Sequence, residues 1–375
     1  TFKHFLINLI KQQKKIGWEI TCVSSRGKYL KELNKMGFNI KKINISRNFN
    51  IFKHIFSLIE IYKYLKKQKF DIIHTHTPLV SIIVRLACIF INETKVVYTA
   101  HGFYFHENMN IFLYNFFLYL EKFLANFTNL IFVQSKEDYN LSIKKIAPKK
   151  TFYIGNGIDL KRFNLKNINL SKTNKIKRKL KIKPNTMVVG MVCRLVHEKG
   201  IKEFLEASLK FSKKNKNFLS IIIGERLKNE HSKSVKMLIE KYKRDMKNQL
   251  IILGKVEDVE NYLAVFSVFC LPSYREGLPR SIIEAMSLKL PVITTNIRGC
   301  RELIKDKVNG FIVPIKNSEL INFRINTLYN SKKLRDKMGE KNFKKVIKFY
   351  DEKNIINKQL NRIYKLLNEK NILYY

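Results

Sequence analysis

The sequence has little cysteine, and what it has is scattered. Five cysteines stand far apart, and neither a CxxC pair nor the Cys/His spacing of a metal site occurs. They are Cys22, Cys88, Cys193, Cys270 and Cys300. An odd and dispersed set disfavours a disulfide framework and predicts buried thiols in a reducing compartment. We therefore expect a cytoplasmic protein without a metal site.

Long apolar runs are also missing. The longest, LVSIIVRLACIFI at residues 79–91, is interrupted by Arg85 and is too short to cross a bilayer. The sequence therefore predicts no transmembrane helix, and it shows no signal peptide. The chain opens on Thr1 rather than on a methionine, which indicates that its beginning is missing.

Acidic residues are few, since 30 Asp and Glu face 72 Lys and Arg, giving a net charge of +42. The excess is spread along the chain, with 24 basic against 10 acidic residues up to position 160 and 48 against 20 after it. A nucleic-acid groove would need clustered charge and a binding motif. We therefore expect a solvated basic surface and no nucleic-acid partner, while attraction to anionic lipid stays open.

What is present is a long, regular alternation of strands and helices. A chain of 375 residues with 45% apolar side chains is large enough for two globular domains. Apolar runs typical of buried parallel strands recur with helical segments between them. The first series is ITCVSS (20–25), DIIHTH (71–76), KVVYTA (95–100), LIFVQS (130–135) and TFYIGNG (151–157).

A second series follows a basic stretch at residues 164–185, interpreted as a linker with a short amphipathic helix. Its runs are MVVGMVCRL (187–195), LSIIIGE (219–225), QLIILGKV (249–256), VFCLPS (268–273), PVITTN (291–296) and GFIVP (310–314). The sequence thus predicts two doubly wound Rossmann-like α/β domains facing across a cleft. We place them at residues 1–165 and 180–344, with a C-terminal helix at 345–375 packing back.

Unusual polar residues follow the carboxyl ends of several strands, where open α/β sheets bind ligands. Arg194 ends one strand, and Lys199 follows five residues later, just before a helix beginning near Ile201. Two cations beside a helix N-terminus form a plausible diphosphate site. The alternative is that both are ordinary solvated side chains.

The stretch PSYREGLPRSIIEAM (272–286) places a turn between a buried strand and a helix. Pro279 suits the first helical position, and the N–H groups of Gly277 and Leu278 are then available to phosphate oxygens. Glu276 and Glu284 can accept hydrogen bonds from sugar hydroxyls. The alternative interpretation is a surface turn residue and a carboxylate paired with a nearby cation.

Together these segments resemble a known family. RLVHEKG (194–200), SYREGLPRSIIEAM (273–286) and PVITTNIRGCRELIKDKVNGFIVP (291–314) closely match the GT-B glycosyltransferases of family 4, which are retaining enzymes that use nucleotide sugars. The eight-residue spacing of Glu276 and Glu284 matches their E-x7-E motif. The resemblance extends to HTHTP (74–78), TAHGF (99–103) and NGIDLKRF (156–163), and covers nearly the whole chain.

The resemblance implies a role for each matching residue. Arg194 and Lys199 would bind the donor diphosphate, Glu276 the donor sugar and Glu284 the ribose. Val256, in GKVEDV (254–259), would meet the nucleotide base. His101 would lie near the reacting sugar, although a lone histidine after a strand is otherwise usually structural.

The resemblance also implies the chemistry. The chain has no DxD motif, so cations are expected to replace the metal that other transferases place on the diphosphate, and no cofactor is expected. A UDP-linked hexose or N-acetylhexosamine is the expected donor. The acceptor would be a glycan on a polyprenyl diphosphate, at an anionic inner-membrane surface.

The aromatic segment NIFLYNFFLYLEKFLANF (110–127) either lies in that membrane interface or is an ordinary core helix.

One departure from the family is the absence of its first strand and glycine-rich loop, which leaves open whether this chain is active. Two other functions fit the architecture. One is a nucleotide-sugar epimerase of the same fold, and the other is a non-catalytic basic remnant that binds nucleic acid or lipid surfaces.

Overall fold

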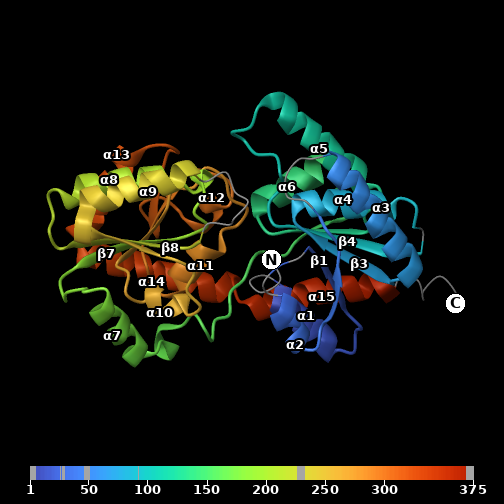
Figure 1. Ribbon diagram of the computed structural model, residues 1–375, viewed down its shortest axis with the longest axis horizontal. Coiled ribbons are helices and arrows are strands. Elements are labelled where there is room, and N and C mark those ends of the chain that lie inside the picture. The colour runs from blue at the N-terminus through green and yellow to red at the C-terminus, as the bar shows by residue number, and fades with distance from the viewer. Residues whose placement is uncertain are drawn as a thin grey trace. The chain divides into compact units, whose positions relative to one another are not determined.

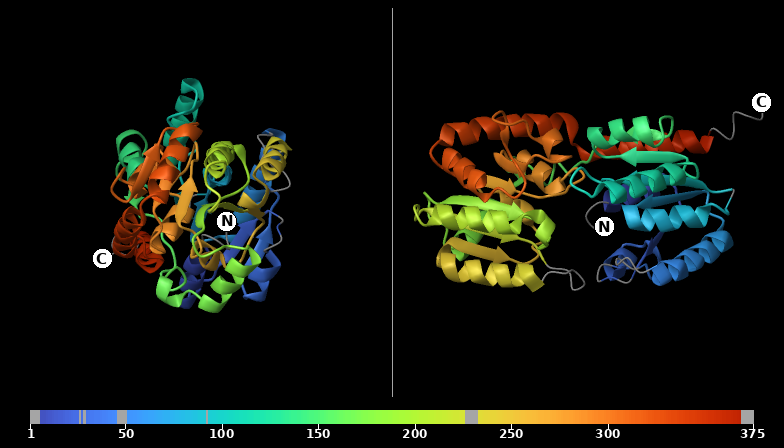
Figure 2. Two further views of the ribbon diagram at one scale, coloured as in Figure 1. Left: turned by 90° about the vertical axis from the view of Figure 1, so that its left-hand side faces the viewer. Right: turned by 90° about the horizontal axis from the view of Figure 1, so that it is seen from above.

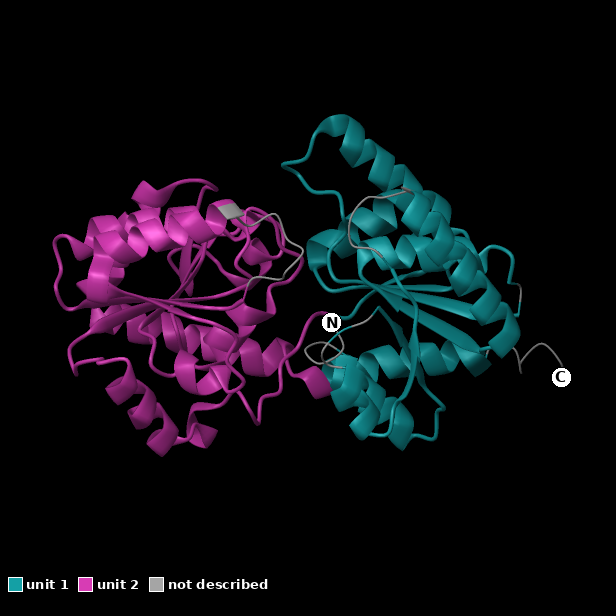
Figure 3. Ribbon diagram, in the orientation of Figure 1, with its two compact units in different colours: residues 1–154, 354–375 teal, residues 155–353 magenta. Residues whose placement is uncertain are grey.

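The computed structural model describes residues 6–25, 27, 30–45, 51–91, 93–225 and 233–368. The chain forms two compact units, coloured separately in Figure 3. Unit 1 comprises residues 1–154 and 354–375, and unit 2 comprises residues 155–353. Every strand pairing in the described residues is parallel, and helices connect the strands (Figure 1). The predicted α/β fold class with two Rossmann-like domains is confirmed.

Unit 2 is built on a six-stranded sheet with the order β12-β11-β10-β7-β8-β9. Its strands are β7 (Met187–Val192), β8 (Phe218–Ile223), β9 (Leu250–Leu253), β10 (Val268–Leu271), β11 (Val292–Thr295) and β12 (Gly310–Val313). The strand order runs outward in both directions from β7 and β10, which pair with each other. This reversal is the topological switch point at which doubly wound sheets bind ligands.

Helices cover both faces of that sheet. In Figure 1, α8, α9 and α13 lie on one face, and α11 and α14 on the other. The helices are α7 (Leu170–Lys179), α8 (Ile201–Ser212), α9 (Lys233–Met246), α10 (Val259–Leu263), α11 (Arg280–Ser287), α12 (Cys300–Leu303), α13 (Ser318–Tyr329) and α14 (Lys332–Phe349). The 3₁₀ turns are η2 (Leu165–Asn167), η3 (His197–Lys199) and η4 (Lys247–Gln249). Because both faces are covered, strands such as β8 and β10 are buried along their whole length.

Unit 1 contains a four-stranded sheet with the order β3-β4-β5-β6 and a separate pair, β1-β2. The strands are β1 (Thr21–Ser24), β2 (Asn39–Lys42), β3 (Ile72–His76), β4 (Lys95–Ala100), β5 (Leu130–Val133) and β6 (Thr151–Tyr153). The helices are α1 (Ile7–Lys15), α2 (Leu30–Lys35), α3 (Ile51–Gln68), α4 (Pro78–Cys88), α5 (Ile111–Ala125), α6 (Lys136–Lys145) and α15 (Glu352–Asn368).

Alternate residues of β4 and β5 enter different apolar clusters, as the period of a strand requires. Tyr98 and Ile131 face a cluster that includes Phe117 of α5. Val97 and Phe132 face another cluster, which contains three residues of α15. The C-terminal helix therefore packs on unit 1, while the predicted end of that helix at residues 369–375 lies outside the described residues.

The division between the units falls at residues 154/155 and 353/354, whereas the sequence placed it near residues 165 and 345. Residues 155–163 pack with unit 2 because Phe163 joins its core and Ile158 pairs with Asp351. The basic stretch at 164–185 is likewise part of unit 2 rather than a free linker. Its helix α7 buries Ile176 in the same core.

All five cysteines are free, and four of them are buried. None of the described helices is long and apolar enough to cross a bilayer.

Candidate functional site

The site is built at the switch point of unit 2, where β7 and β10 end side by side. The chain leaves β7 through Cys193 and Arg194, makes the turn η3 and enters α8 at Ile201. It leaves β10 through Pro272 and Ser273 and enters α11. The predicted cations and the predicted carboxylates therefore follow adjacent strands.

Lys199 and Glu276 meet directly. Lys199 Nζ lies 2.7 Å from Glu276 Oε1, and their side chains are only 14% and 12% exposed. Ser273 Oγ donates to the same carboxylate oxygen at 2.7 Å. The pair is thus held in one geometry, with an ammonium and a carboxylate together at the ligand-binding edge of the sheet.

Close backbone packing brings these two loops together. Gly200 has a φ of +69°, and a Cβ at this position would lie 1.9 Å from the carbonyl oxygen of Pro272. Tyr274 N donates to the Glu198 carbonyl at 2.8 Å, and its hydroxyl donates to the Glu203 carboxylate at 2.5 Å. Only glycine at position 200 permits this approach, which sets Lys199 beside Glu276.

The Arg194 guanidinium lies 3.2 Å from the Glu198 carboxylate, and its side chain is half exposed. The neighbouring Cys193 is not a candidate nucleophile. Burial raises the pKa of its thiol to about 12, so the thiol stays protonated at neutral pH.

The turn before α11 presents the predicted anion-binding N–H groups. Pro279 is the N-cap, and α11 begins one residue later than predicted, at Arg280. Within the described part of the chain, the N–H groups of Gly277 and Leu278 have no hydrogen-bond acceptor. Asn156 Nδ2 donates to the Leu278 carbonyl at 2.9 Å and fixes the turn from the other side. Both N–H groups are therefore open to an anion.

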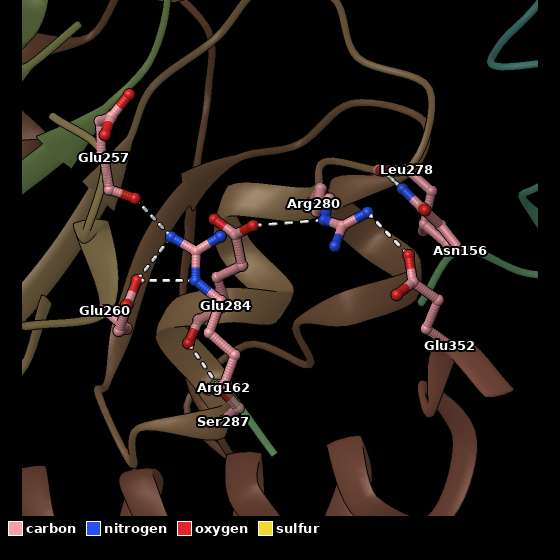
Figure 4. Close-up of polar contacts among 9 residues, drawn as sticks. All are labelled: Asn156, Arg162, Glu257, Glu260, Leu278, Arg280, Glu284, Ser287 and Glu352. Atoms are coloured by element: carbon pink, nitrogen blue, oxygen red, sulfur yellow. Dashed lines mark hydrogen bonds and ion pairs between the residues drawn. The ribbon is translucent and has the colours of Figure 1, made fainter. Parts of the chain in front are cut away.

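Glu284 lies on α11 between two arginines, as Figure 4 shows. Arg280 Nε is 3.2 Å from Glu284 Oε1, and another nitrogen of the same guanidinium, Nη1, is 3.2 Å from Glu352. Burial raises the pKa of Glu284, while the positive charges of Arg280 and Arg162 act in the opposite direction. The carboxylate is only 14% exposed, so its orientation is set by these partners.

Arg162 also holds the segment that follows Val256. Its guanidinium donates to the Glu260 carboxylate and to the Glu257 carbonyl, both at 2.6 Å (Figure 4). Val256 itself is half-buried between β9 and α10 and packs against the core of unit 2. Arg162 thus fixes the segment that follows Val256, and its positive charge also acts on the Glu284 carboxylate.

Three residues that shape this site were not predicted from the sequence, namely Asn156, Arg162 and Arg280. The first two lie in NGIDLKRF, which was noted only as a family motif of the N-terminal domain. Their partners are far away in sequence, since Leu278 lies 122 positions after Asn156. Spacing could therefore not identify them, although the motif marked the segment.

His101 belongs to unit 1, where it follows β4. Its Nε2 lies 3.3 Å from His76 Nδ1, and the rings of His74 and His76 lie with centroids 4.1 Å apart at an interplanar angle of 34°. Burial lowers the pKa of His74 to about 3 and that of His101 to about 4, and it also lowers the pKa of His76. The three imidazoles are consequently neutral at pH 7, and His101 can only donate or accept neutral hydrogen bonds.

No group of three or more His, Cys, Asp or Glu side chains in the described ranges is arranged to hold a metal ion.

Two family models match the chain. The model described as "Glycosyl transferases group 1" matches residues 172–345, and that described as "Glycosyltransferase Family 4" matches residues 4–162.

Named relatives match over most of the chain. An Escherichia coli UDP-Gal:alpha-D-GlcNAc-diphosphoundecaprenol alpha-1,3-galactosyltransferase is 34% identical over 280 residues, which is 73% of this chain and 70% of the relative. A Campylobacter jejuni N,N'-diacetylbacillosaminyl-diphospho-undecaprenol alpha-1,3-N-acetylgalactosaminyltransferase is 26% identical over 96% of this chain and 94% of its own length. Among solved structures, Anabaena HepE in complex with UDP and glucose has a TM-score of 0.81, with 20% identity over 96% of this chain and 95% of that chain.

Proposed function

The chain belongs to the GT-B glycosyltransferases of family 4, and we propose that it transfers a sugar from a UDP donor to a lipid-linked or growing surface glycan, with retention of the anomeric configuration. The observation that carries the proposal is the Lys199–Glu276 pair at the switch point of unit 2. A cation and a hydrogen-bonding carboxylate at this edge suit a donor that combines a diphosphate with a sugar.

UDP and the lipid carrier are supported by the relatives. The E. coli relative is named for a UDP-galactose donor and a diphosphoundecaprenol acceptor, and the C. jejuni relative for a diphospho-undecaprenol acceptor. We propose the same two substrate classes here, together with work at an anionic membrane surface.

In the proposed reaction the bond between the anomeric carbon and the diphosphate oxygen breaks, and negative charge builds up on the leaving group. Lys199 and Arg194 stabilise that charge together with the N–H groups of Gly277 and Leu278. The acceptor oxygen attacks from the face that the diphosphate leaves. Its proton passes to a phosphate oxygen of the leaving UDP, so that no covalent enzyme intermediate forms.

The carboxylates act on the donor hydroxyls. Glu276 accepts from the sugar and Glu284 from the ribose, while neutral His101 orients a hydroxyl of the donor sugar. Because protein cations carry the diphosphate, we propose that no metal is needed. Chelation with EDTA should then leave the rate unchanged.

The test is transfer from a panel of UDP-, GDP- and ADP-sugars to a polyprenyl-diphosphate glycan. We expect one UDP-sugar to react and NMR of the product to show the anomeric configuration of the donor. Lys199→Ala should lower kcat/KM by about 10²–10³-fold. The control is Lys202→Ala, because this lysine is 54% exposed on the same loop–helix segment and lies 3.7 Å from Glu206. An inverted product, or an epimerised donor without acceptor, would contradict the proposal.

A further inference from the structure

A row of polar side chains leads from the C-terminal helix to His101 within unit 1. Helix α15 lies against the sheet of this unit, as Figure 1 and the right view of Figure 2 show, and three of its residues join an apolar cluster there. Gln359 of the same helix is only 5% exposed, and its Nε2 donates to Thr99 Oγ1 at 3.0 Å. Burying an amide among apolar side chains costs free energy unless it is hydrogen-bonded, so this contact is a specific one.

Thr99 connects this amide to the histidines. It lies in β4, is 2% exposed, and its Oγ1 is 2.8 Å from His74 Nε2. A threonine hydroxyl has one hydrogen and two lone pairs. Because one lone pair accepts from Gln359, the hydrogen of the hydroxyl can point to His74 Nε2. Burial keeps His74 neutral by lowering its pKa to about 3, so the proton of this imidazole then lies on Nδ1.

The row continues from His74 to His101. His74 and His76 are two positions apart in β3 and therefore point to the same face of the sheet, with ring centroids 4.1 Å apart. His76 Nδ1 lies 3.3 Å from His101 Nε2. On the other side, Gln134 follows β5, and its hydrogen bond with His101 raises the pKa of this histidine against the effect of burial. His101 is thus held by neighbours from both strands that flank β4.

The row ends at the surface of unit 1 rather than inside its core. The imidazoles of His74, His76 and His101 are all partly exposed, at the carboxyl ends of strands, where α/β sheets bind ligands. A neutral imidazole can carry its proton on either nitrogen. A fixed tautomer therefore decides which nitrogen of His101 donates a hydrogen bond and which accepts one.

We propose that Thr99 and Gln359 are positioning residues for His101. Acting through His74 and His76, they hold its imidazole in one tautomer and one orientation. The C-terminal helix thereby takes part in the site of the unit on which it packs. The inference rests on the proposed function in that His101 is assigned there to a hydroxyl of the donor sugar.

The test is long-range 1H–15N NMR of protein labelled with 15N-histidine, which reports the tautomer of each neutral imidazole. The chain has eight histidines, and a His101→Gln variant identifies the signals of His101. Thr99→Val removes the hydroxyl and keeps the branched shape, whereas Thr99→Ser keeps the hydroxyl. We expect one His101 tautomer in the wild type and in Thr99→Ser, and a mixture of both tautomers in Thr99→Val and Gln359→Met.

The control is Thr128→Val in the same unit. Thr128 is 1% exposed and its hydroxyl donates to the Leu124 carbonyl at 2.8 Å, so this change also removes a buried hydroxyl and its hydrogen bond. Thermal unfolding will verify that the variants fold. In donor kinetics, Thr99→Val should lower kcat about tenfold and leave the KM for the donor within about twofold, because His101 loses both its tautomer and its orientation. Thr99→Ser and Thr128→Val should keep most of kcat.

A mixture of His101 tautomers in the wild type, or a single one in both Thr99→Val and Gln359→Met, would overturn the inference. So would a Thr99→Ser protein that behaves like Thr99→Val, an equal effect of Thr128→Val, or an unchanged kcat in Thr99→Val. If no nucleotide sugar reacts with any of the proteins while the spectra follow the prediction, only the proposed function is contradicted, because the spectra need no substrate.

Discussion

At the scale of single residues, Arg280 joins carboxylates from different parts of unit 2. It contacts Glu284 on its own helix and Glu352 at the start of α15. The proposed ribose ligand is therefore oriented by a side chain that would itself not touch the donor. Arg280 is a positioning residue, and its effect should appear in donor affinity rather than in the chemical step.

Replacing Arg280 with methionine should raise the KM for the donor about tenfold, which corresponds to about 1.4 kcal/mol. The reason is that Glu284 loses the cation that fixes its rotamer. The turnover number should change much less, because the ribose contact is the same in the ground state and in the transition state. Steady-state kinetics against donor concentration measure both parameters. Arg244→Met, at an exposed position of α9, is the control, and an unchanged KM in Arg280→Met would contradict the positioning role.

The histidine group gives unit 1 a pH dependence. Since the pKa of folded His74 is about 3 and its ordinary value is 6.5, the unfolded chain binds the proton more readily. Stability should therefore fall as the pH drops from about 6.5 toward 4, by up to about 1.4 kcal/mol per pH unit for each such histidine. Urea unfolding at pH 7 and pH 5 measures the difference. His74→Gln should reduce the difference while exposed His197→Gln should not, and an equal loss in all three proteins would disprove the assignment.

The sequence could propose single site residues where a motif placed them after a strand, as with Lys199 and Glu276. It could not identify Arg162, because its partner Glu260 is 98 residues away and arginines are common throughout this basic chain. A long-range ion pair leaves no local pattern, so it becomes visible only when the fold brings its members together.

At the scale of elements, two glycines allow the site loops to touch. Gly299 precedes α12 with a φ of +80°, and a Cβ there would lie 1.6 Å from the Gly277 carbonyl oxygen. Gly200 likewise packs against the Pro272 carbonyl oxygen, which leaves no room for a Cβ. The Gly277–Pro279 turn can hold its shape only while no side chain occupies position 299.

Gly299→Ala should therefore destabilise the protein and weaken donor binding together. The positive φ alone costs about 1–2 kcal/mol, and relief of the clash must displace the turn that presents the Gly277 and Leu278 N–H groups. Thermal unfolding and UDP calorimetry measure the two effects. The control is Gly27→Ala in unit 1, because a Cβ there meets nothing within 4 Å. A Gly299→Ala protein with wild-type stability would show that the turn does not need this glycine.

The buried ion pair between Arg85 of α4 and Glu121 of α5 is the other element-scale feature. Glu121→Ala should lower the free energy of unfolding by about 3–5 kcal/mol, because it leaves Arg85 charged and unpaired in the core. The double change Arg85→Met/Glu121→Leu should recover most of that loss. Asp336→Ala, which breaks a largely exposed pair with Lys332, should cost less than about 1 kcal/mol. Equal losses for Glu121→Ala and Asp336→Ala would contradict the buried-pair account.

The apolar runs predicted eleven of the named strands, since strands buried on both faces are apolar throughout. They did not predict β2, whose sequence Asn39–Lys42 is mostly exposed and pairs only with β1. An edge strand with polar side chains carries no such signal. The apolar pattern also could not show which side of α5 is buried, because apolar side chains lie on both its buried and its exposed side.

At the scale of the whole molecule, the chain crosses between its two units at residues 154/155 and 353/354. The segments beside these crossings pair with each other, since Ile158 donates to the Tyr350 carbonyl and accepts from Glu352 N. Both segments also reach the start of α11, through Asn156 and through Glu352. Sequence could predict two Rossmann-like domains, but not that the connecting segments pack as part of unit 2.

We propose above all that unit 2 binds a nucleotide diphosphate at Lys199 and Glu276. The most direct measurement is calorimetric titration of UDP into the wild type, Lys199→Ala, Glu276→Gln and the control Lys202→Ala. We predict saturable binding to the wild type and the control, a loss of affinity of at least tenfold in Lys199→Ala and a smaller loss in Glu276→Gln. Wild-type affinity in Lys199→Ala, or no UDP binding to any of the four proteins, would contradict the account.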